Sequence, residues 1–164
     1  MRFWRWIGGR LFTADAIYGL ILFSALISAT SDVNETAIEV LLIAGFTLIT
    51  FWAAHVFAST MATHGVGDEA GDTLGASIRR AIGHSSGMLY ASVLPSLALL
   101  LGVFGALSTD DAVSLALLFA MILLGVLGYE SFARRGRSRP VRVVGAIGTA
   151  FFGFLMILLN TLVH

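Results

Sequence analysis

The chain has 164 residues, of which 57% are hydrophobic and 12% are charged, and its formal net charge is zero. Such a chain has too little polar surface to coat a soluble globule of this size, so the composition indicates an integral membrane protein. We therefore expect the lipid bilayer as its main partner and no nucleic-acid partner. The absence of cysteine excludes disulfides, thiolate metal sites and thiol redox chemistry.

All ten basic residues are arginines, and they fall into three groups, at 2–10, 79–80 and 134–142. Short, strongly basic loops next to apolar spans stay on the cytoplasmic side of a membrane. The loops around 31–35 and 108–111 are acidic and contain no arginine. The pattern predicts that the arginine groups share the inner side and that the acidic loops lie outside.

Apolar runs between these loops predict a single, all-α membrane domain with five spans. The amino end is expected inside and the carboxyl end outside, in a multi-pass protein of the cell membrane. The expected helices are about 11–29, 37–62, 86–107, 112–133 and 143–163, with a cytoplasmic loop at 63–85.

Three local signals refine this prediction. Thr36 and Glu39 have the spacing of a capping box at a helix start. Pro95 is expected to kink the third span. Leu74 and Ile78 recur at helical spacing within the predicted loop, which favours a short amphipathic helix on the membrane surface.

The amino end has an alternative interpretation as a cleaved signal peptide. Residues 2–10 would form its basic region, and the apolar residues after Ala16 its hydrophobic region. Ile27 breaks the small-residue pattern that a cleavage site before Ala29 requires, so we favour a retained first helix.

Small side chains recur every four residues along two of the expected helices, which lets helices approach closely in lipid. Packing within one chain is the simpler use of these faces, and a homodimer through them is the alternative. The residues are Gly145, Thr149 and Gly153 in the fifth helix, and Ala112, Ala116 and Ala120 in the fourth.

Asp15, His55 and Glu130 are ionisable residues within the expected spans, where charge is costly. All three fall toward the inner third of their helices. They are therefore candidates for a cytoplasm-facing cavity that binds a cation or relays protons. The alternatives are a favourable helix-dipole position for Asp15 and an interfacial pair of Glu130 with Arg134.

The predicted loop offers a second candidate site. His64, Asp68 and Asp72 are spaced four residues apart, which on a helix would align one imidazole and two carboxylates toward a divalent metal. Glycines at 65, 67 and 71 oppose a firm helix there, so a solvated acidic loop is the alternative. A divalent metal is the one cofactor that the sequence suggests.

The chain has no nucleophile with a base, phosphate loop, dinucleotide fingerprint or zinc-protease motif. We therefore expect a protein that is not an enzyme.

Residues 91–128 and 136–148, followed by a last apolar helix, resemble the third to fifth helices of the vacuolar iron transporter family. Asp15-Ala-Ile-Tyr-Gly19 is similar to the opening of that family's first helix. Thr60-Met61-Ala62 is similar to its Ser-Met-Ala stretch late in the second. The resemblance implies a five-helix membrane fold and a cation as cargo.

This chain departs from the family at its metal ligands. Family members carry a second Asp inside the first helix, where this chain has Ile21, Leu22 and Phe23. They carry a Glu after the Ser-Met-Ala stretch, where Thr63 and His64 stand here, and their long Glu-rich insertion is replaced by the short loop. Hard divalent cations need several oxygen ligands. We therefore expect a shared fold without shared iron chemistry.

A fainter resemblance links Arg10, Asp15-Ala-Ile and Phe51-Trp52-Ala-Ala-His55 to a lysosomal and bacterial potassium channel family. The first helix of that family bears Phe-Ser-Asp, which Thr13-Ala14-Asp15 replaces here, and its sixth helix is lacking.

Two function classes remain. The first is a small membrane protein with the iron/manganese-transporter-like fold that moves a cation or protons. The second is a membrane scaffold or partner subunit that retains the fold without the metal site.

Overall fold

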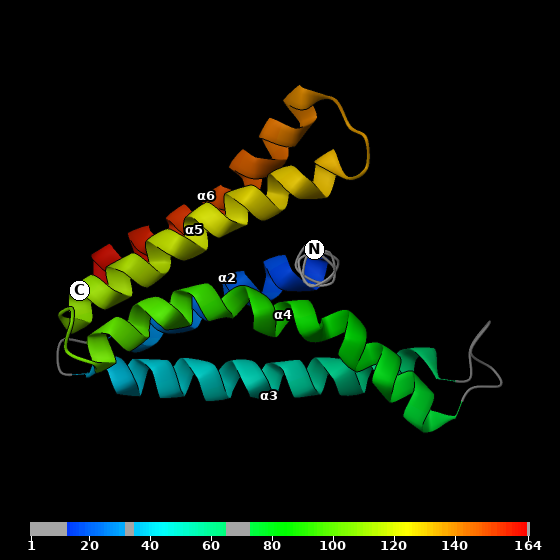
Figure 1. Cartoon of the computed structure of the whole chain (residues 1–164), viewed down its shortest axis with the longest axis horizontal. Coiled ribbons are helices and arrows are strands. Elements are labelled where there is room, and N and C mark those ends of the chain that lie inside the picture. The colour runs from blue at the N-terminus through cyan, green and yellow to red at the C-terminus, as the bar shows by residue number, and fades with distance from the viewer. Residues whose placement is uncertain (1–12, 32–34, 65–72, 164) are drawn as a thin grey trace.

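The computed structural model describes residues 13–31, 35–64 and 73–163, and these form five helices and no strand. The helices are α2 (Ala14–Thr30), α3 (Ala37–Thr63), α4 (Leu74–Val103), α5 (Thr109–Ala133) and α6 (Arg139–Val163) (Figure 1). The predicted all-α class with five helices is confirmed. The basic region of the alternative signal peptide lies outside the described residues.

Four of these helices, α3 to α6, are long and apolar enough to cross a membrane. α2 is also apolar but has 17 residues, or about 25 Å of helix. Only helices and closed barrels satisfy all backbone hydrogen bonds in lipid. The protein is therefore an integral membrane protein built from helices.

Successive helices run in opposite directions, so the connections alternate between two ends of the bundle (Figure 1). We call one the arginine end, because the α3–α4 and α5–α6 hairpins bring all arginines of the described residues there. The opposite end, which holds the α2–α3 and α4–α5 connections, we call the acidic end. Its acids are Glu35, Glu39, Asp110 and Asp111.

α4 is longer than predicted at the arginine end. It begins at Leu74, so residues 74–85 are its first turns, whereas we expected a loop over 63–85 and a span over 86–107. Thr73 caps the helix by accepting a hydrogen bond from the Ala76 amide, and Ser77 and Ala81 are buried. The expected amphipathic helix is thus the projecting part of α4, paired with the end of α3 (Figure 1).

The other boundaries follow the cap chemistry. Glu39 accepts hydrogen bonds from the Thr36 amide and hydroxyl, each at 2.8 Å, as the capping box predicts. α4 and α5 each end just before a glycine in the left-handed conformation, Gly105 and Gly136, which closes the helix with little strain. α6 begins at Arg139, four residues before the predicted start. Pro95 lies inside α4, which is bent in Figure 1.

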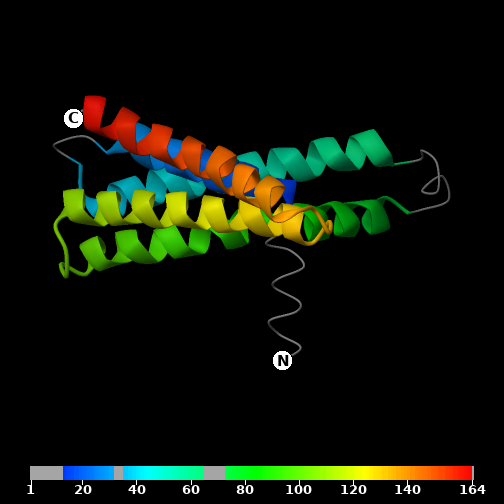
Figure 2. The same ribbon diagram turned by 90° about the horizontal axis from the view of Figure 1, so that it is seen from above.

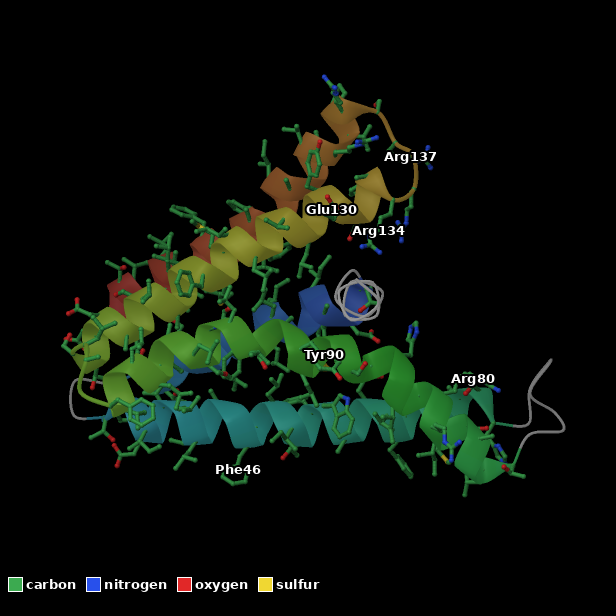
Figure 3. All side chains as sticks on the ribbon, in the orientation of Figure 1. Phe46, Arg80, Tyr90, Glu130, Arg134 and Arg137 are labelled. Atoms are coloured by element: carbon green, nitrogen blue, oxygen red, sulfur yellow. The ribbon has the colours of Figure 1, made fainter. Side chains whose placement is uncertain are left out.

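α2 lies inside the bundle and, like α5, contacts all four other helices. Its side chains Leu20, Phe23 and Ile27 are fully buried and join the apolar core. Figure 2 shows α6 crossing α2, where Ser28 donates a hydrogen bond to the Met156 carbonyl. The outer faces of α3 and α6 remain apolar and exposed, as lipid-facing surfaces must. Phe46 on α3 points away from the bundle and is 68% exposed (Figure 3).

The small-residue faces are used inside this one chain. The Gly145 face of α6 lies against α5 so closely that a Cβ at Gly128, Gly145 or Gly153 would overlap the neighbouring helix. Thr149 donates a 2.7 Å hydrogen bond to the Leu124 carbonyl. On α5, the three alanines at 112, 116 and 120 are fully buried. These faces therefore serve the simpler of the two predicted uses, and a homodimer would need another surface.

The α5–α6 contact can be tested with two glycines of α6. An added Cβ at Gly153 would lie 2.6 Å from Met121 Cα, while one at Gly148 would meet nothing within 4 Å. We expect Gly153→Ala to destabilise the protein by roughly 1–3 kcal/mol, because backbone atoms cannot yield as a flexible side chain can. Gly148→Ala should be neutral or stabilising by up to about 1 kcal/mol. Unfolding midpoints in detergent micelles measure both, and equal effects would contradict the packing described.

Candidate functional site

Asp15 lies in the first turn of α2, near the arginine end. Thr13 caps this helix by accepting a 3.2 Å hydrogen bond from the Ala16 amide. One turn further along, α2 touches the backbone of α4: a Cβ at Gly19 would lie 2.7 Å from Met88 Cα. This close approach presses the start of α2 onto α4 and leaves the Asp15 side chain only 15% exposed.

Two histidines from two other helices face this carboxylate. His55 on α3 places its Nε2 3.6 Å from Asp15 Oδ1, and His84 on α4 places its Nε2 3.9 Å from Asp15 Oδ2. The His55 side chain is 38% exposed and that of His84 is 77% exposed. The three residues form what we call the Asp15 cluster, with a mostly buried acid and an exposed imidazole.

The cluster lies at one level of the bundle. Counted at 1.5 Å per residue from the acidic end of each helix, Asp15, His55 and His84 lie roughly 22, 27 and 28 Å along α2, α3 and α4. A bilayer's hydrocarbon core is about 30 Å thick. If the acidic ends of these helices lie at one boundary of the hydrocarbon, the cluster lies near the opposite boundary, at the arginine end.

Buried polar atoms without a partner gather along the same three helices. Among the described residues, Asp15 Oδ2, Trp52 Nε1 and Ser85 Oγ are buried and make no hydrogen bond. Trp52 lies one turn from His55, and Ser85 follows His84. Buried polar groups normally have a protein or water partner. These three groups can each hydrogen-bond to water, and Asp15 alone among them can also bind a proton.

Glu130, the third residue expected at this site, has a different partner. Its Oε2 lies 4.0 Å from Arg134 Nε, one turn further along α5. Within the described residues it makes no ion pair with either histidine of the Asp15 cluster. Figure 3 shows Glu130 and Arg134 on α5, which diverges from α3 and α4 toward the arginine end. This arrangement is the interfacial pair that we considered as the alternative.

The second predicted site is only partly visible. His64, just after α3, has its Nδ1 3.1 Å from the hydroxyl of Ser77 on α4, which helps to hold the hairpin together. Asp68 and Asp72 lie outside the described residues. In the part of the chain that the structure describes, no group of three or more His, Asp or Glu side chains is arranged to hold a metal ion.

The chemistry available at the Asp15 cluster is proton exchange. A carboxylate and an imidazole can each take or release a proton, and histidine does so near neutral pH. Both nitrogen-to-oxygen distances exceed hydrogen-bond length, so a water molecule or a small side-chain movement has to bridge them. His84 is thus the exposed member of the cluster, and Asp15 is the member that is nearly buried.

Two residues of the site were missed by sequence reasoning. His84 fell in the predicted loop, and Gly19 was noted only as part of a resemblance. The available signal was the helical spacing of Leu74, Ile78 and Ala81: extended by one turn, it places His84 on α4. Gly19 on α2 lies against Met88 on α4. Asp15 precedes Gly19 by four residues, and His84 precedes Met88 by four residues, so two parallel helices in contact bring Asp15 and His84 together as well.

No known protein family model matches the chain, and neither a curated protein nor a solved structure matches it.

The cluster's geometry can be checked by paired cysteines, since the chain has none of its own. We expect a short bis-thiosulfonate reagent to crosslink the two cysteines of Asp15→Cys/His84→Cys and those of Asp15→Cys/His55→Cys. Crosslinked cysteines can no longer react with a maleimide-polymer that is added afterwards. The matched control pairs Asp15→Cys with His64→Cys, because His64 contacts Ser77, roughly 10 Å before His84 along α4. Equal protection of all three pairs would contradict the cluster.

Proposed function

We propose that this protein moves protons across the membrane in which it resides and that the Asp15 cluster is where the proton is taken up or released. The observation that supports this most directly is the environment of Asp15. A carboxylate that is mostly buried in an apolar helix, with one buried oxygen that makes no hydrogen bond, faces histidines from two other helices. Ionisable groups are costly at such a position and are typically functional there.

The proposal includes an orientation. Because short arginine-rich loops remain in the cytoplasm, the arginine end faces inward and the carboxyl end of α6 faces outward. In a cell membrane the Asp15 cluster then exchanges protons with the cytoplasm through His84. The acidic end, with its helix caps, faces the other side.

The resemblance to vacuolar iron transporters is consistent with a membrane protein that moves a cation, and we extend it no further. The oxygen ligands that iron or manganese would need are replaced here by apolar residues such as Ile21 and Leu22. Asp15 is the acid that this chain has in the stretch similar to the opening of that family's first helix. A proton needs only one basic atom at a time, which the cluster supplies.

A scaffold or partner subunit is the second candidate, and the outer half of the bundle favours it. Phe23, Ile27 and Leu99 are at most 1% exposed and form continuous apolar packing toward the acidic end. Ser24 on the same helix donates its hydroxyl hydrogen bond to the Leu20 carbonyl. A transporter must open this half in another conformation, whereas a scaffold has no need to.

Proton flux into proteoliposomes separates the two candidates. With an internal pH-sensitive dye and valinomycin to set the membrane potential, we expect the purified protein to acidify vesicles faster than empty ones. Asp15→Asn should abolish this flux, because an amide cannot bind a proton at neutral pH. His84→Gln should reduce it about tenfold or more, as expected for loss of a general acid–base group.

Glu130→Gln provides the matched control, because it removes a carboxylate of the arginine end that pairs with Arg134. Its flux should remain within twofold of the unmodified protein. Each variant is also compared by its unfolding midpoint, so that a folding defect is not mistaken for lost transport. Flux that persists in Asp15→Asn, or no flux in the unmodified protein, would refute the proposal and leave the scaffold.

A further inference from the structure

A second polar feature lies on the opposite side of the start of α2. A pocket of about 290 Å³ opens between the first turn of α2 and the last turn of α5. Ala14 and Ile17 line it from α2, and Ser131 and Phe132 from α5, with Arg134 and Arg135 at its rim. It is lined by different residues from those of the Asp15 cluster, and it mixes apolar walls with positive charge.

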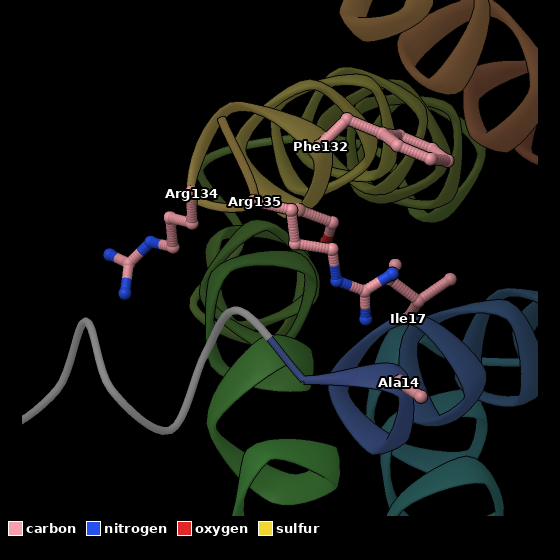
Figure 4. A pocket seen from close by; sticks show the side chains of 6 residues that line it. Ala14, Ile17, Phe132, Arg134 and Arg135 are labelled. Carbon is pink, nitrogen blue, oxygen red and sulfur yellow. The ribbon is translucent and has the colours of Figure 1, made fainter. Parts of the chain in front are cut away.

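The two arginines point in different directions (Figure 4). The Arg134 guanidinium extends away from the pocket and is paired with Glu130. Arg135 instead extends across the pocket, with its guanidinium beside Ile17 (Figure 4). Within the described part of the chain, Arg135 makes no hydrogen bond or ion pair. A guanidinium that has no anionic partner, placed over a partly apolar pocket, can bind an anionic group such as a phosphate.

The position of the pocket indicates where that phosphate comes from. Ala14 begins α2, and Arg135 lies two residues after Ala133, the last residue of α5, so the pocket lies where these helices leave the hydrocarbon. Lipid headgroups occupy this level, and their acyl chains run alongside the apolar residues below it. Basic pockets between membrane helices are recognised sites for anionic headgroups.

We propose that this pocket binds the headgroup of an anionic phospholipid, with Arg135 contacting the lipid phosphate and Ile17 and Phe132 contacting the glycerol and the upper acyl chain. The pocket volume suits a headgroup, being at the lower end of small-molecule sites. Further arginines at 137, 139 and 142 lie on the adjoining hairpin and do not line the pocket. The proposal does not depend on proton transport.

Native mass spectrometry of the full chain tests the site. The protein is released from detergent micelles that contain equal amounts of phosphatidylglycerol and phosphatidylcholine, and retained lipid is counted. We expect preferential retention of phosphatidylglycerol, reduced about fivefold by Arg135→Gln, the effect of about one basic residue at a membrane surface. Arg135→Lys should keep most of the retention, because the charge remains.

Arg139→Gln is the matched control, since it removes an arginine of the same hairpin that lies outside the pocket. Its lipid retention should stay within twofold of the unmodified protein. Equal losses in Arg139→Gln and Arg135→Gln would show a diffuse basic surface and overturn the proposal. So would displacement of phosphatidylglycerol by millimolar inorganic phosphate, which would show a site for the free anion. Unchanged retention in Arg135→Gln would also reject it.

Discussion

The contact between Gly19 and Met88 fixes the register on which the site depends. α2 and α4 both run from the arginine end to the acidic end, so residues one turn earlier on each helix also come together. Those residues are Asp15 and His84, 3.9 Å apart. Any side chain at Gly19 would push the helices apart, since the Met88 backbone lies against it. In a membrane, where lipid is as apolar as the helices, such close packing replaces the hydrophobic effect as the force that holds helices in register.

Much of the fold could be predicted because membranes impose strong rules on a sequence. The arginine groups and the acidic loops alternate along the chain, and the described helices alternate in direction to match. The start of α4 could not be located in this way. The first turns of α4, which include Leu74, Ser77 and Arg80, continue beyond the hydrocarbon. Because this segment mixes apolar and polar residues, hydropathy alone predicts a loop there. What stabilises this segment is its pairing with the end of α3, a tertiary contact that no local signal reveals.

Site residues could be predicted from the sequence only where the signal lay within a single helix. Asp15 and His55 were singled out because each is an ionisable residue in an apolar run, and the structure brings them to 3.6 Å. Glu130 met the same criterion and instead pairs with Arg134, because α5 diverges from α3 and α4 at this end (Figure 1). The relative angle of two helices depends on how their faces pack along their whole length. For α5 one such set of contacts is made by glycines packed against α6, and nothing in Glu130 itself reveals them.

The start of α2 separates two chemically different surfaces, and this arrangement constrains how a proton could pass. Asp15 faces the histidines, while Ala14 and Ile17 face the pocket beside Arg135. Beyond the first turn, α2 is surrounded by apolar side chains such as Phe23 and Ile27, so an ionised carboxylate cannot move toward the acidic end without a large cost. A protonated carboxyl carries no charge and avoids most of that cost. In the proposed proton transport, proton uptake at Asp15 would therefore precede any movement of α2. A lipid bound in the pocket between Arg135 and Ile17 would oppose that movement, because Ile17 belongs to the start of α2.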